Sequence, residues 1–429
     1  MPLGRRAVEM LVVALALLTL PARAQDLRGH GGPVRAMAML PAGDALATAS
    51  FDSTVILWSL GDGRARQVLR FHEGVVHAVA VLTDGRVASA GEDARIAIWQ
   101  PGSTQPAAVL EGHRGPVVAL VAAPDGRRLA SAAWDGSVRL WSLDGGAPEV
   151  LDHQGVNVNG VGFLGDGRLV SGAYDGTVRL FAADGRALTV ASTGAPISML
   201  MVISGDEIVA AGADGQLRFY DSGLQPTGRL VVAEAPLVAV AATRDGRLLA
   251  AAGFRGALAV IDRRERRIVR RMEGPAFPLW SLAFTTDGEE ILTGGSDRLV
   301  RRWRVATGEP VSPVLAGPDD GIPAALRTHP GAEVFRACQA CHSLSGRDEA
   351  RAGPTLAGLY GRRIGTAGGY DFSPALRAMD IIWSPETLQK LFEIGPAAYT
   401  PGTKMPEQKL INGEDRKALA EFLGLADKR

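Results

Sequence analysis

Short stretches that alternate apolar and polar residues, separated by tight-turn residues, recur along most of this chain. Asp-Gly turns such as Asp125-Gly126 and Asp166-Gly167 lie between many of these stretches. Alternation on both sides of such a pair indicates β-hairpins. The apolar residue that closes one strand of each unit recurs at intervals of 41, 42, 40, 39, 41 and 42 residues, at Trp58, Trp99, Trp141, Phe181, Tyr220, Ile261 and Trp303.

Seven repeats of this unit predict a seven-bladed β-propeller over residues 25–315, because four strands in about 40 residues are typical of a propeller blade. The pattern weakens in blade six, where Arg255 replaces the expected turn aspartate, so the bounds of that blade are uncertain. Ring closure is also left open. The outer strand of the last blade comes either from Asp26–Gly29 or from Pro310–Leu315.

Histidine, serine or threonine, and aspartate recur together in the first four units. His30, His72, His113 and His153 each precede a turn aspartate by 21 or 22 residues, and a Ser or Thr lies four residues before that aspartate. A single set would suggest a Ser-His-Asp catalytic triad. Recurrence at the structural period favours a different role, in which these residues join strands by buried hydrogen bonds.

The pattern becomes helical after residue 330. Helical spacing and capping residues predict helices near Gly331–His342, Ser384–Ile394 and Asn412–Leu423. Residues 316–329 are rich in Pro and Gly, which is typical of a semi-rigid linker. All five lysines of the chain lie in its last forty residues, at Lys390, Lys404, Lys409, Lys417 and Lys428. We therefore predict a second, all-α domain over residues 330–429.

The N-terminus has the layout of a secretory signal peptide. Arg5 and Arg6 precede an apolar run, Met10–Leu20, which is followed by Ala22-Arg23-Ala24. The run is shorter than the ~20 apolar residues that cross a bilayer, so we expect no membrane span. We predict a signal peptide at residues 1–24, cleavage before Gln25 and a periplasmic location. Lys+Arg and Asp+Glu number 46 each, so no basic field indicates a nucleic-acid partner.

Cys338-Gln-Ala-Cys341-His342 matches the C-x-x-C-H pattern of c-type haem attachment. On one helical turn, two thiols at this spacing reach two porphyrin vinyl groups, and the next side chain brings an imidazole to the iron. The only two cysteines of the chain are these two. A zinc site would need two more Cys or His ligands nearby, and a thioredoxin-like pair would need a βαβ setting. The sequence therefore predicts one covalent haem c.

Residues 25–315 resemble the WD-repeat β-propeller family, in their period and in their recurring His, Ser/Thr, Asp and Trp. In that family the residue before each turn aspartate lies on the face where partners dock. Here this position holds several aromatic residues, and exposed aromatic rings often anchor interfaces. The resemblance therefore implies four partner-docking candidates, Phe51, Trp134, Tyr174 and Phe254. Alternatively, these rings pack under neighbouring loops.

Residues 330–425 resemble class I cytochrome c. The resemblance rests on the haem motif and on the segments Gly353–Arg362, Ile381–Trp383 and Tyr399–Met405. It implies that His342 and Met405 are the axial ligands of the haem iron, and that the Pro354 carbonyl accepts a hydrogen bond from the His342 ring. It also implies haem-propionate contacts from Arg362, Trp383 and Thr403, and a helix crossing at Gly331 and Phe422.

These features predict a multidomain chain, an all-β seven-bladed propeller followed by an all-α class I cytochrome c domain. We interpret it as a periplasmic protein that transfers single electrons, with the propeller docking a redox partner and without a small-molecule substrate or catalytic residues. Fourteen basic and fourteen acidic residues over 319–429 predict a partner charged differently from that of mitochondrial cytochrome c. One alternative is an oxidoreductase with an active site or second cofactor in the propeller. Another is a sensor in which the ligands of the haem control binding by the propeller.

Overall fold

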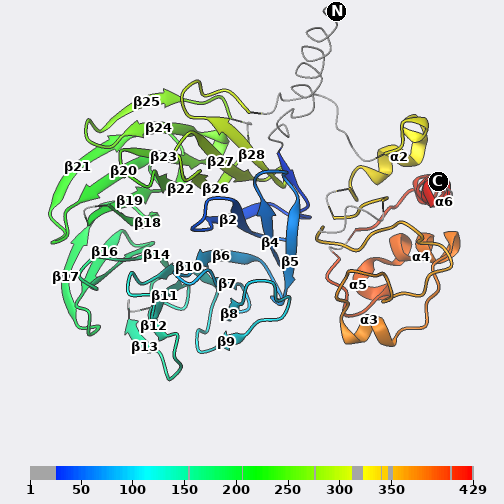
Figure 1. Ribbon diagram of the computed structural model, residues 1–429, viewed down its shortest axis with the longest axis horizontal. Helices are drawn as coiled ribbons and strands as arrows, with labels where there is room; N and C mark the ends of the chain where they lie inside the picture. The colour runs from blue at the N-terminus through cyan, green and yellow to red at the C-terminus, as the bar shows by residue number, and fades with distance from the viewer. Residues whose placement is uncertain are drawn as a thin grey trace, which may run out of the picture.

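Two units lie side by side in the computed structural model, a ring of sheets and a smaller group of helices (Figure 1). The structure describes residues 26–152, 155–204, 206–274, 277–311, 322–339, 341–345, 351–405 and 408–427. The predicted signal peptide lies outside these residues, as do residues 316–321 of the predicted linker. Among the described residues, no helix is long and apolar enough to cross a membrane.

The ring consists of seven antiparallel four-stranded sheets, which confirms the predicted seven-bladed propeller. Blades one to six each use four consecutive strands, from β2–β5 to β22–β25, and blade seven combines β26–β28 with β1. The strands are β1 Leu27–Arg28, β2 Val34–Met39, β3 Ala45–Ser50, β4 Thr54–Ser59, β5 Ala65–Arg70, β6 Val76–Val81, β7 Val87–Gly91, β8 Ile96–Trp99, β9 Ala108–Leu110, β10 Val117–Ala122, β11 Arg128–Ala133, β12 Ser137–Ser142, β13 Glu149–Asp152, β14 Val158–Phe163, β15 Leu169–Ala173, β16 Thr177–Phe181, β17 Ala187–Ser192, β18 Ile197–Ile203, β19 Glu207–Gly212, β20 Gln216–Tyr220, β21 Pro226–Val231, β22 Leu237–Ala242, β23 Leu248–Gly253, β24 Leu258–Asp262, β25 Arg267–Arg271, β26 Leu279–Phe284, β27 Glu290–Gly295 and β28 Leu299–Arg304.

The propeller core lies between neighbouring sheets. The second strand of each blade is buried on both faces, as in β3, where all six residues are buried. Outer strands are more exposed, as in β17. Small residues dominate the second strands, and the closing aromatic residues Trp58 and Trp99 fill the space between adjacent sheets. Burial of apolar surface between the sheets therefore stabilises the ring as a whole.

The ring is closed by the N-terminal strand. Leu27 pairs with Val300 and Arg28 with Leu299, so that β1 forms the outer strand of blade seven. Leu27 is fully buried in the core cluster between blades seven and one. Of the two segments that the sequence left open, the N-terminal one supplies the strand.

The repeated His, Ser/Thr and Asp residues form hydrogen-bonded networks inside the blades, as expected. In blade one, His30 Nδ1 lies 2.9 Å from Asp52 and its Nε2 lies 2.7 Å from Thr48, whose hydroxyl accepts a bond from Trp58 Nε1. Blades two and three repeat this geometry. His153 of blade four lies outside the described residues. The three networks among the described residues join strands, and their hydroxyl residues Thr48, Ser89 and Ser131 are fully buried.

Blade six keeps its four strands although its turn differs from that of the other blades. Phe254–Gly256 forms the short 3-10 helix η1, in which Arg255 has a φ of 58°. The turn therefore adopts a left-handed backbone without the aspartate that stabilises the corresponding turns elsewhere. The uncertain bounds of this blade are thus settled by strands β22 to β25.

The C-terminal unit is helical, as predicted. Its helices are η2 Ala324–Leu326, α2 Pro330–Phe335, α3 Pro374–Ala378, α4 Pro385–Ile394, α5 Pro396–Tyr399 and α6 Gly413–Asp427. Ser384 caps α4 with a capping box, and the Asn412 side chain accepts a bond from the Glu414 amide at the start of α6. Ile322 and Leu326 pack in the core of this unit, so its packing begins within the segment predicted as a linker.

Helices α2 and α6 cross at the predicted residues. A Cβ on Gly331 would collide with the Ala418 carbonyl and the Phe422 side chain, so only glycine permits the close approach. Helix α2 is shorter than expected. It ends at Phe335, and the chain continues through tighter turns in which the Cys338 amide donates to Phe335 and the Cys341 amide to Cys338. The haem motif therefore lies on turns after the helix.

Candidate functional site

A cavity of about 380 Å³ opens in the helical unit and brings the predicted haem ligands together. Cys338, Cys341, His342 and Met405 all line it, although Met405 is more than sixty residues away along the chain. Most of the remaining wall is apolar. Its side chains come from α2, α4, α6 and the loop before α3: Phe335, Leu356, Leu359, Ile364, Leu388, Leu391, Phe392, Leu419 and Leu423. A cavity of this size and character suits a flat apolar cofactor.

The two cysteines are available for covalent attachment. Neither forms a disulfide, and both are largely enclosed by the cavity wall. Burial raises the pKa of the Cys338 thiol to about 11 and that of the Cys341 thiol to about 12. Both sulfurs are therefore neutral thiols at neutral pH in the folded chain without haem.

The His342 ring is held in one orientation by the chain that follows it. Its Nδ1 donates to the Pro354 carbonyl over 2.7 Å, as predicted, which leaves Nε2 as the ligand atom. The Gly353 amide donates to the Cys341 carbonyl over 2.9 Å, and a Cβ on Gly353 would lie 2.5 Å from the ring. Burial lowers the pKa of His342, which keeps the imidazole neutral, as a metal ligand must be.

Met405 lies on the wall of the same cavity. Its amide donates to the Thr403 hydroxyl over 3.1 Å, which shapes the turn that presents the thioether. The other methionine of this unit, Met379, directly follows α3 and is not among the described residues that line the cavity. The geometry therefore favours Met405 as the sulfur ligand.

Arg362, Trp383 and Thr403, the predicted propionate contacts, all lie on the cavity wall. The Arg362 guanidinium donates to the carbonyls of Ala357 and Thr355 over 2.9 Å and 2.8 Å. Burial lowers the pKa of Arg362, and the side chain carries its charge because a guanidinium stays protonated in proteins. The structure thus brings a cation, an indole and a hydroxyl to one cavity, and the contacts with propionates stay a prediction.

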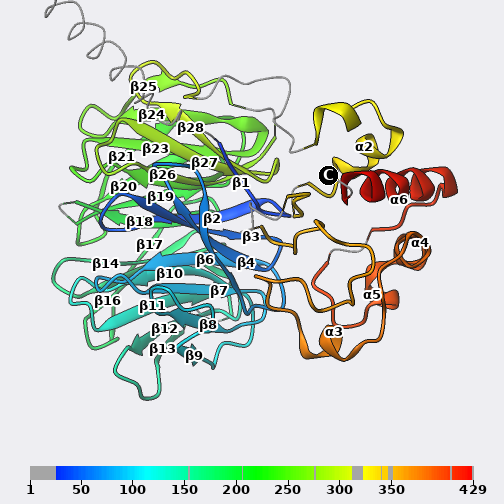
Figure 2. The same cartoon turned by 45° about the vertical axis from the view of Figure 1, so that its right-hand side comes forward.

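Three cavity residues come from the propeller and were not predicted. Asp52, Thr54 and Arg70 of blade one line the wall that faces the ring of sheets. In Figure 2 strands β3 and β4 lie next to the loops of the helical unit. Burial would raise the pKa of Asp52, but contacts with His30, Thr54 and the Gly31 amide lower it overall, so the carboxylate is ionised. Sequence motifs could not reveal this wall, because Arg70 and its partner Ala352 are 282 residues apart.

The aromatic docking candidates combine exposure with packing. Phe51, Trp134 and Tyr174 are 39 %, 41 % and 58 % exposed, whereas Phe254 is half-buried. The rings of Phe51 and Phe254 both pack against Trp280, at centroid distances of 6.2 Å and 5.2 Å. Trp280 therefore holds the rings of Phe51 and Phe254 in place at the surface. Phe51 also directly precedes Asp52 of the cavity wall. Their role in docking stays a prediction.

The donor set fits a c-type haem. Two thiols, a neutral imidazole with its second nitrogen fixed, and a thioether converge on one apolar cavity with a polar side. A structural zinc site would require a cluster of further ligands, and the described residues contain no group of three or more His, Cys, Asp or Glu side chains that could hold a metal ion.

Comparison with protein families agrees with both units. Residues 22–59, 63–100, 104–142, 149–181 and 266–304 match the family "WD domain, G-beta repeat". The unmatched stretch between residues 181 and 266 includes blades five and six, where the His and Asp pattern is weakest. The N-terminal unit is thus a propeller of WD repeats.

Residues 329–425 match the family "Cytochrome c". Cytochrome c of Cochliobolus lunatus is 38 % identical over 94 residues, which are 22 % of this chain and 86 % of that protein. Cytochrome c of Arabidopsis thaliana is also 38 % identical, over 22 % of this chain and 83 % of that protein. Cytochrome c2 iso-2 of Magnetospirillum molischianum is 39 % identical over 89 residues, 21 % of this chain and 90 % of that protein. Through its C-terminal domain, which is a haem electron-transfer module, this chain belongs to the cytochrome c family.

Proposed function

We propose that this chain is a periplasmic carrier of single electrons, with one covalent haem c in the C-terminal domain and a propeller that docks the redox partner. The observation that carries the proposal is the convergence of Cys338, Cys341, His342 and Met405 on one cavity. Only one C-x-x-C-H motif exists in the chain, which supports a single haem.

A haem in this cavity would supply reversible one-electron chemistry at its iron. The residues of the chain would fix both axial positions, since His342 and Met405 approach from separate segments of the cavity wall. A thioether opposite an imidazole favours the reduced iron and raises the reduction potential. The apolar wall excludes water. With both positions filled, the site favours electron exchange over binding of small molecules.

The haem assignment is tested with full-length protein that is exported by a host with haem-attachment machinery. Acid–acetone extraction should leave the haem on the polypeptide, and the visible spectrum should show haem c alone. Extractable haem would contradict the covalent assignment. A second chromophore would contradict the carrier proposal and favour the oxidoreductase with a further cofactor in the propeller.

The proposed location rests on the signal-peptide pattern of residues 1–24. Export also suits the haem, because both Cys338 and Cys341 must meet a haem-attachment system as free thiols. N-terminal sequencing of protein from the periplasmic fraction should begin at Gln25. Recovery of the intact N-terminus in the cytoplasmic fraction would contradict the proposal.

The aromatic face of the propeller also carries one positive charge. The Arg35 guanidinium lies 6.0 Å from the Trp280 ring centroid, and burial lowers the pKa of Arg35 to about 10, so it stays protonated at neutral pH. Within the described part of the chain, no carboxylate pairs with it. An acidic group of the redox partner opposite Arg35 would provide that pairing, while the apolar surface of the partner covers Phe51 and Phe254.

The docking proposal is tested by stopped-flow reduction, with soluble electron carriers fractionated from the native periplasm as the donors. Replacing Phe51 and Phe254 with Ser should slow reduction at low protein concentration about tenfold or more, since anchor aromatics each contribute about 2 kcal/mol to binding. Val190→Ser with Val231→Ser is a matched control, because these residues are 51 % and 60 % exposed on outer strands. Equal rates for all three proteins would contradict docking on this face.

A further inference from the structure

The segments of the cytochrome domain that carry the axial-ligand candidates also contact the propeller. Ala352 lies two residues before Pro354, whose carbonyl holds His342, and Lys404 lies directly before Met405. We propose that the propeller is a positioning element of the haem site, which holds both ligand-bearing segments in place. The inference rests on the proposed function in one respect, namely that His342 and Met405 bind the iron.

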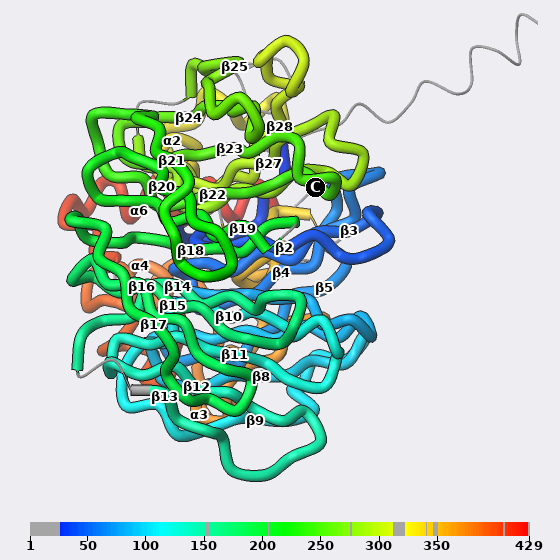
Figure 3. The backbone as a smooth tube through the Cα atoms, turned by 90° about the vertical axis from the view of Figure 1, so that its left-hand side faces the viewer, coloured from blue at the N-terminus to red at the C-terminus, as the bar shows by residue number. Residues whose placement is uncertain are grey.

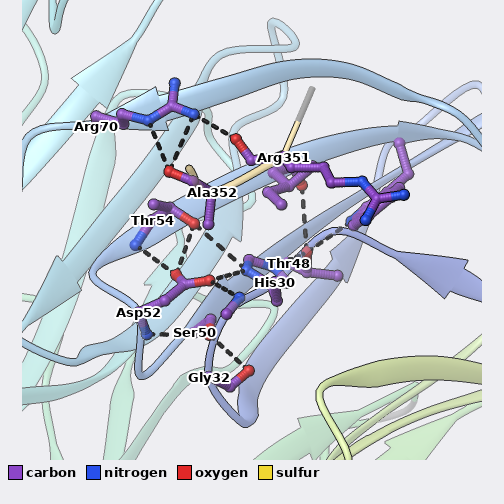
Figure 4. Close-up of polar contacts among 12 residues, drawn as sticks. His30, Gly32, Thr48, Ser50, Asp52, Thr54, Arg70, Arg351 and Ala352 are labelled. Carbon is purple, nitrogen blue, oxygen red and sulfur yellow. Dashed lines mark hydrogen bonds and ion pairs between the residues drawn. The ribbon is translucent and has the colours of Figure 1, made fainter. Parts of the chain in front are cut away.

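On the histidine side, Arg70 holds the segment that packs against the imidazole. Its guanidinium donates to the carbonyls of Arg351 and Ala352, and the Ala352 amide donates to the Gly29 carbonyl over 3.0 Å. Figure 4 shows the bonds from Arg70 to Arg351 and Ala352 next to the blade-one network. The same guanidinium lies 4.2 Å from the Tyr370 ring centroid. Because Gly353 and Pro354 follow at once, a shift of this segment would turn the His342 ring.

On the methionine side, the contact is made to a rigid point of blade two. Lys404 Nζ donates to the main-chain carbonyl of His72 over 3.0 Å. The His72 ring is itself held by Asp93 at 3.0 Å and by Ser89 at 2.8 Å. These buried bonds restrain His72, and with it the carbonyl that accepts from Lys404. Lys404 therefore anchors the turn that presents Met405.

Next to Cys341, the propeller approaches the cytochrome domain so closely that Gly31 leaves no room for a side chain. A Cβ on Gly31 would collide with Cys341 Sγ. The equivalent position, directly after the network histidine, holds Glu73 in blade two and Arg114 in blade three. The amide at this position donates to the turn aspartate in all three blades, so the backbone is the same. A side chain there is compatible with a blade but not with the docked cytochrome.

This comparison supplies a sharp variant for the full-length holoprotein. Gly31→Glu places in blade one the residue that blade two already carries, and it should displace the cytochrome domain without unfolding the propeller. Arg114→Glu is the matched control, since Arg114 is exposed at the same position of blade three. The radius of gyration from small-angle scattering reports whether the domains separate, and thermal unfolding reports whether the propeller stays folded.

The second measurement follows the ligands of the haem. Imidazole should bind the ferric Gly31→Glu protein about tenfold faster, as expected if the form in which Met405 has left the iron is about tenfold more populated. The sulfur-to-iron charge-transfer band should weaken, and the reduction potential should fall. Since coupling is reciprocal, Met405→Ala should in turn loosen the contact between the domains.

Arg70→Met provides an independent variant that leaves Gly31 in place. Arg271 is its matched control, because it is also the last residue of an outer strand and donates to a main-chain carbonyl, that of Val232, within the propeller. Arg70→Met should speed imidazole binding and Arg271→Met should not.

Two results would overturn the proposal. In one, Gly31→Glu separates the domains while the imidazole rate, the band and the potential stay as in the parent protein. In the other, the parent protein already has the larger radius of gyration, and neither Gly31→Glu nor Arg70→Met changes any of the four quantities. Failure of the proposed function is distinguishable, because the parent protein itself would then lack covalent haem or the sulfur-to-iron band.

Discussion

The propeller and the cytochrome domain of this chain are stabilised in different ways. The propeller buries the same kinds of residues seven times between neighbouring sheets, and Trp58 and Trp99 at these interfaces are 1 % and 2 % exposed. The cytochrome domain has one core cluster, which includes Phe335, Leu391 and Phe422 and surrounds a cavity of about 380 Å³. Seen from the propeller side, the blades lie in front of these helices (Figure 3).

The difference shows where each domain tolerates change. A propeller can lose the pattern in one blade, as blade six does with Arg255 and Ile261, because the other interfaces remain. The cytochrome domain has no repeat to compensate, and the group that fills its cavity contributes directly to its stability. Loss of the haem should therefore unfold one domain and spare the other.

The largest expected effect comes from the two cysteines. Cys338→Ser with Cys341→Ser should abolish covalent haem and remove the thermal transition of the cytochrome domain, while the propeller transition stays. Either single replacement should weaken attachment without abolishing it, because one thioether remains. Acid–acetone extraction and calorimetry measure the two effects. Retention of haem by the double variant through extraction would contradict the assignment.

The second effect concerns the iron alone. Met405→Ala should remove the sulfur-to-iron charge-transfer band and admit cyanide. It should also lower the reduction potential by on the order of 0.1 V or more, since axial ligands move haem potentials over a range of about 0.8 V. Met379→Ala is the control and should change none of these. A band that survives in Met405→Ala would show that another residue is the ligand.

The third effect is confined to one blade of the propeller. Ser131→Ala removes the hydroxyl that accepts from Trp141 Nε1 over 2.8 Å and faces His113 Nε2 at 2.7 Å. Two buried groups lose their partner, so the free energy of unfolding of the propeller should fall by about 1–3 kcal/mol. Ser142→Ala, at an exposed position of the same blade, is the control. Chemical denaturation followed by tryptophan fluorescence should show the loss, without any change in the haem spectrum.

The last effect is a pH dependence of stability that is confined to the propeller. Burial, assisted by the nearby charge of Arg35, lowers the pKa of His77 from 6.5 to about 4. The unfolded chain therefore binds a proton between about pH 6.5 and pH 4 that the folded propeller does not bind, so propeller stability falls as the pH falls through this window. The loss is on the order of 1–3 kcal/mol.

His77→Phe should flatten this dependence, measured as the thermal midpoint of the propeller at several pH values. The carboxylates of the His–Asp networks change the stability of the propeller only at lower pH. For Asp93, burial opposes ionisation, but the His72 contacts prevail and lower the pKa to about 2. An unchanged slope in His77→Phe between pH 6.5 and pH 4 would assign the effect to other groups.

Local patterns in the sequence predicted each domain, because each pattern reflects a local requirement. Trp58 and its six equivalents recur at the length of one blade, because each blade is one four-stranded sheet. The C-x-x-C-H spacing brings two sulfurs and an imidazole together on adjacent turns. Ring closure by Leu27 could not be predicted, since two short segments fit equally and only packing against Val300 decides. The end of α2 at Phe335 was also missed.

No local sequence pattern predicted that the propeller forms one wall of the cavity. Arg70 and Lys404 reach partners 282 and 332 residues away. Arg70 lies in no motif of the propeller, and the segment Tyr399–Met405, which contains Lys404, gives no sign of a contact with another domain. Gly31 differs from Glu73 and Arg114 in the sequence, but glycine at a loop position has many explanations. Only the docked arrangement shows that Cys341 occupies the space of the missing side chain.

The central claim is that this chain carries one covalent haem after export. Intact-mass measurement of the purified full-length protein under denaturing conditions tests it most directly. The account predicts a single species, with the mass of residues 25–429 plus one haem. The unmodified polypeptide mass, or a mass that includes residues 1–24 without haem, would contradict it.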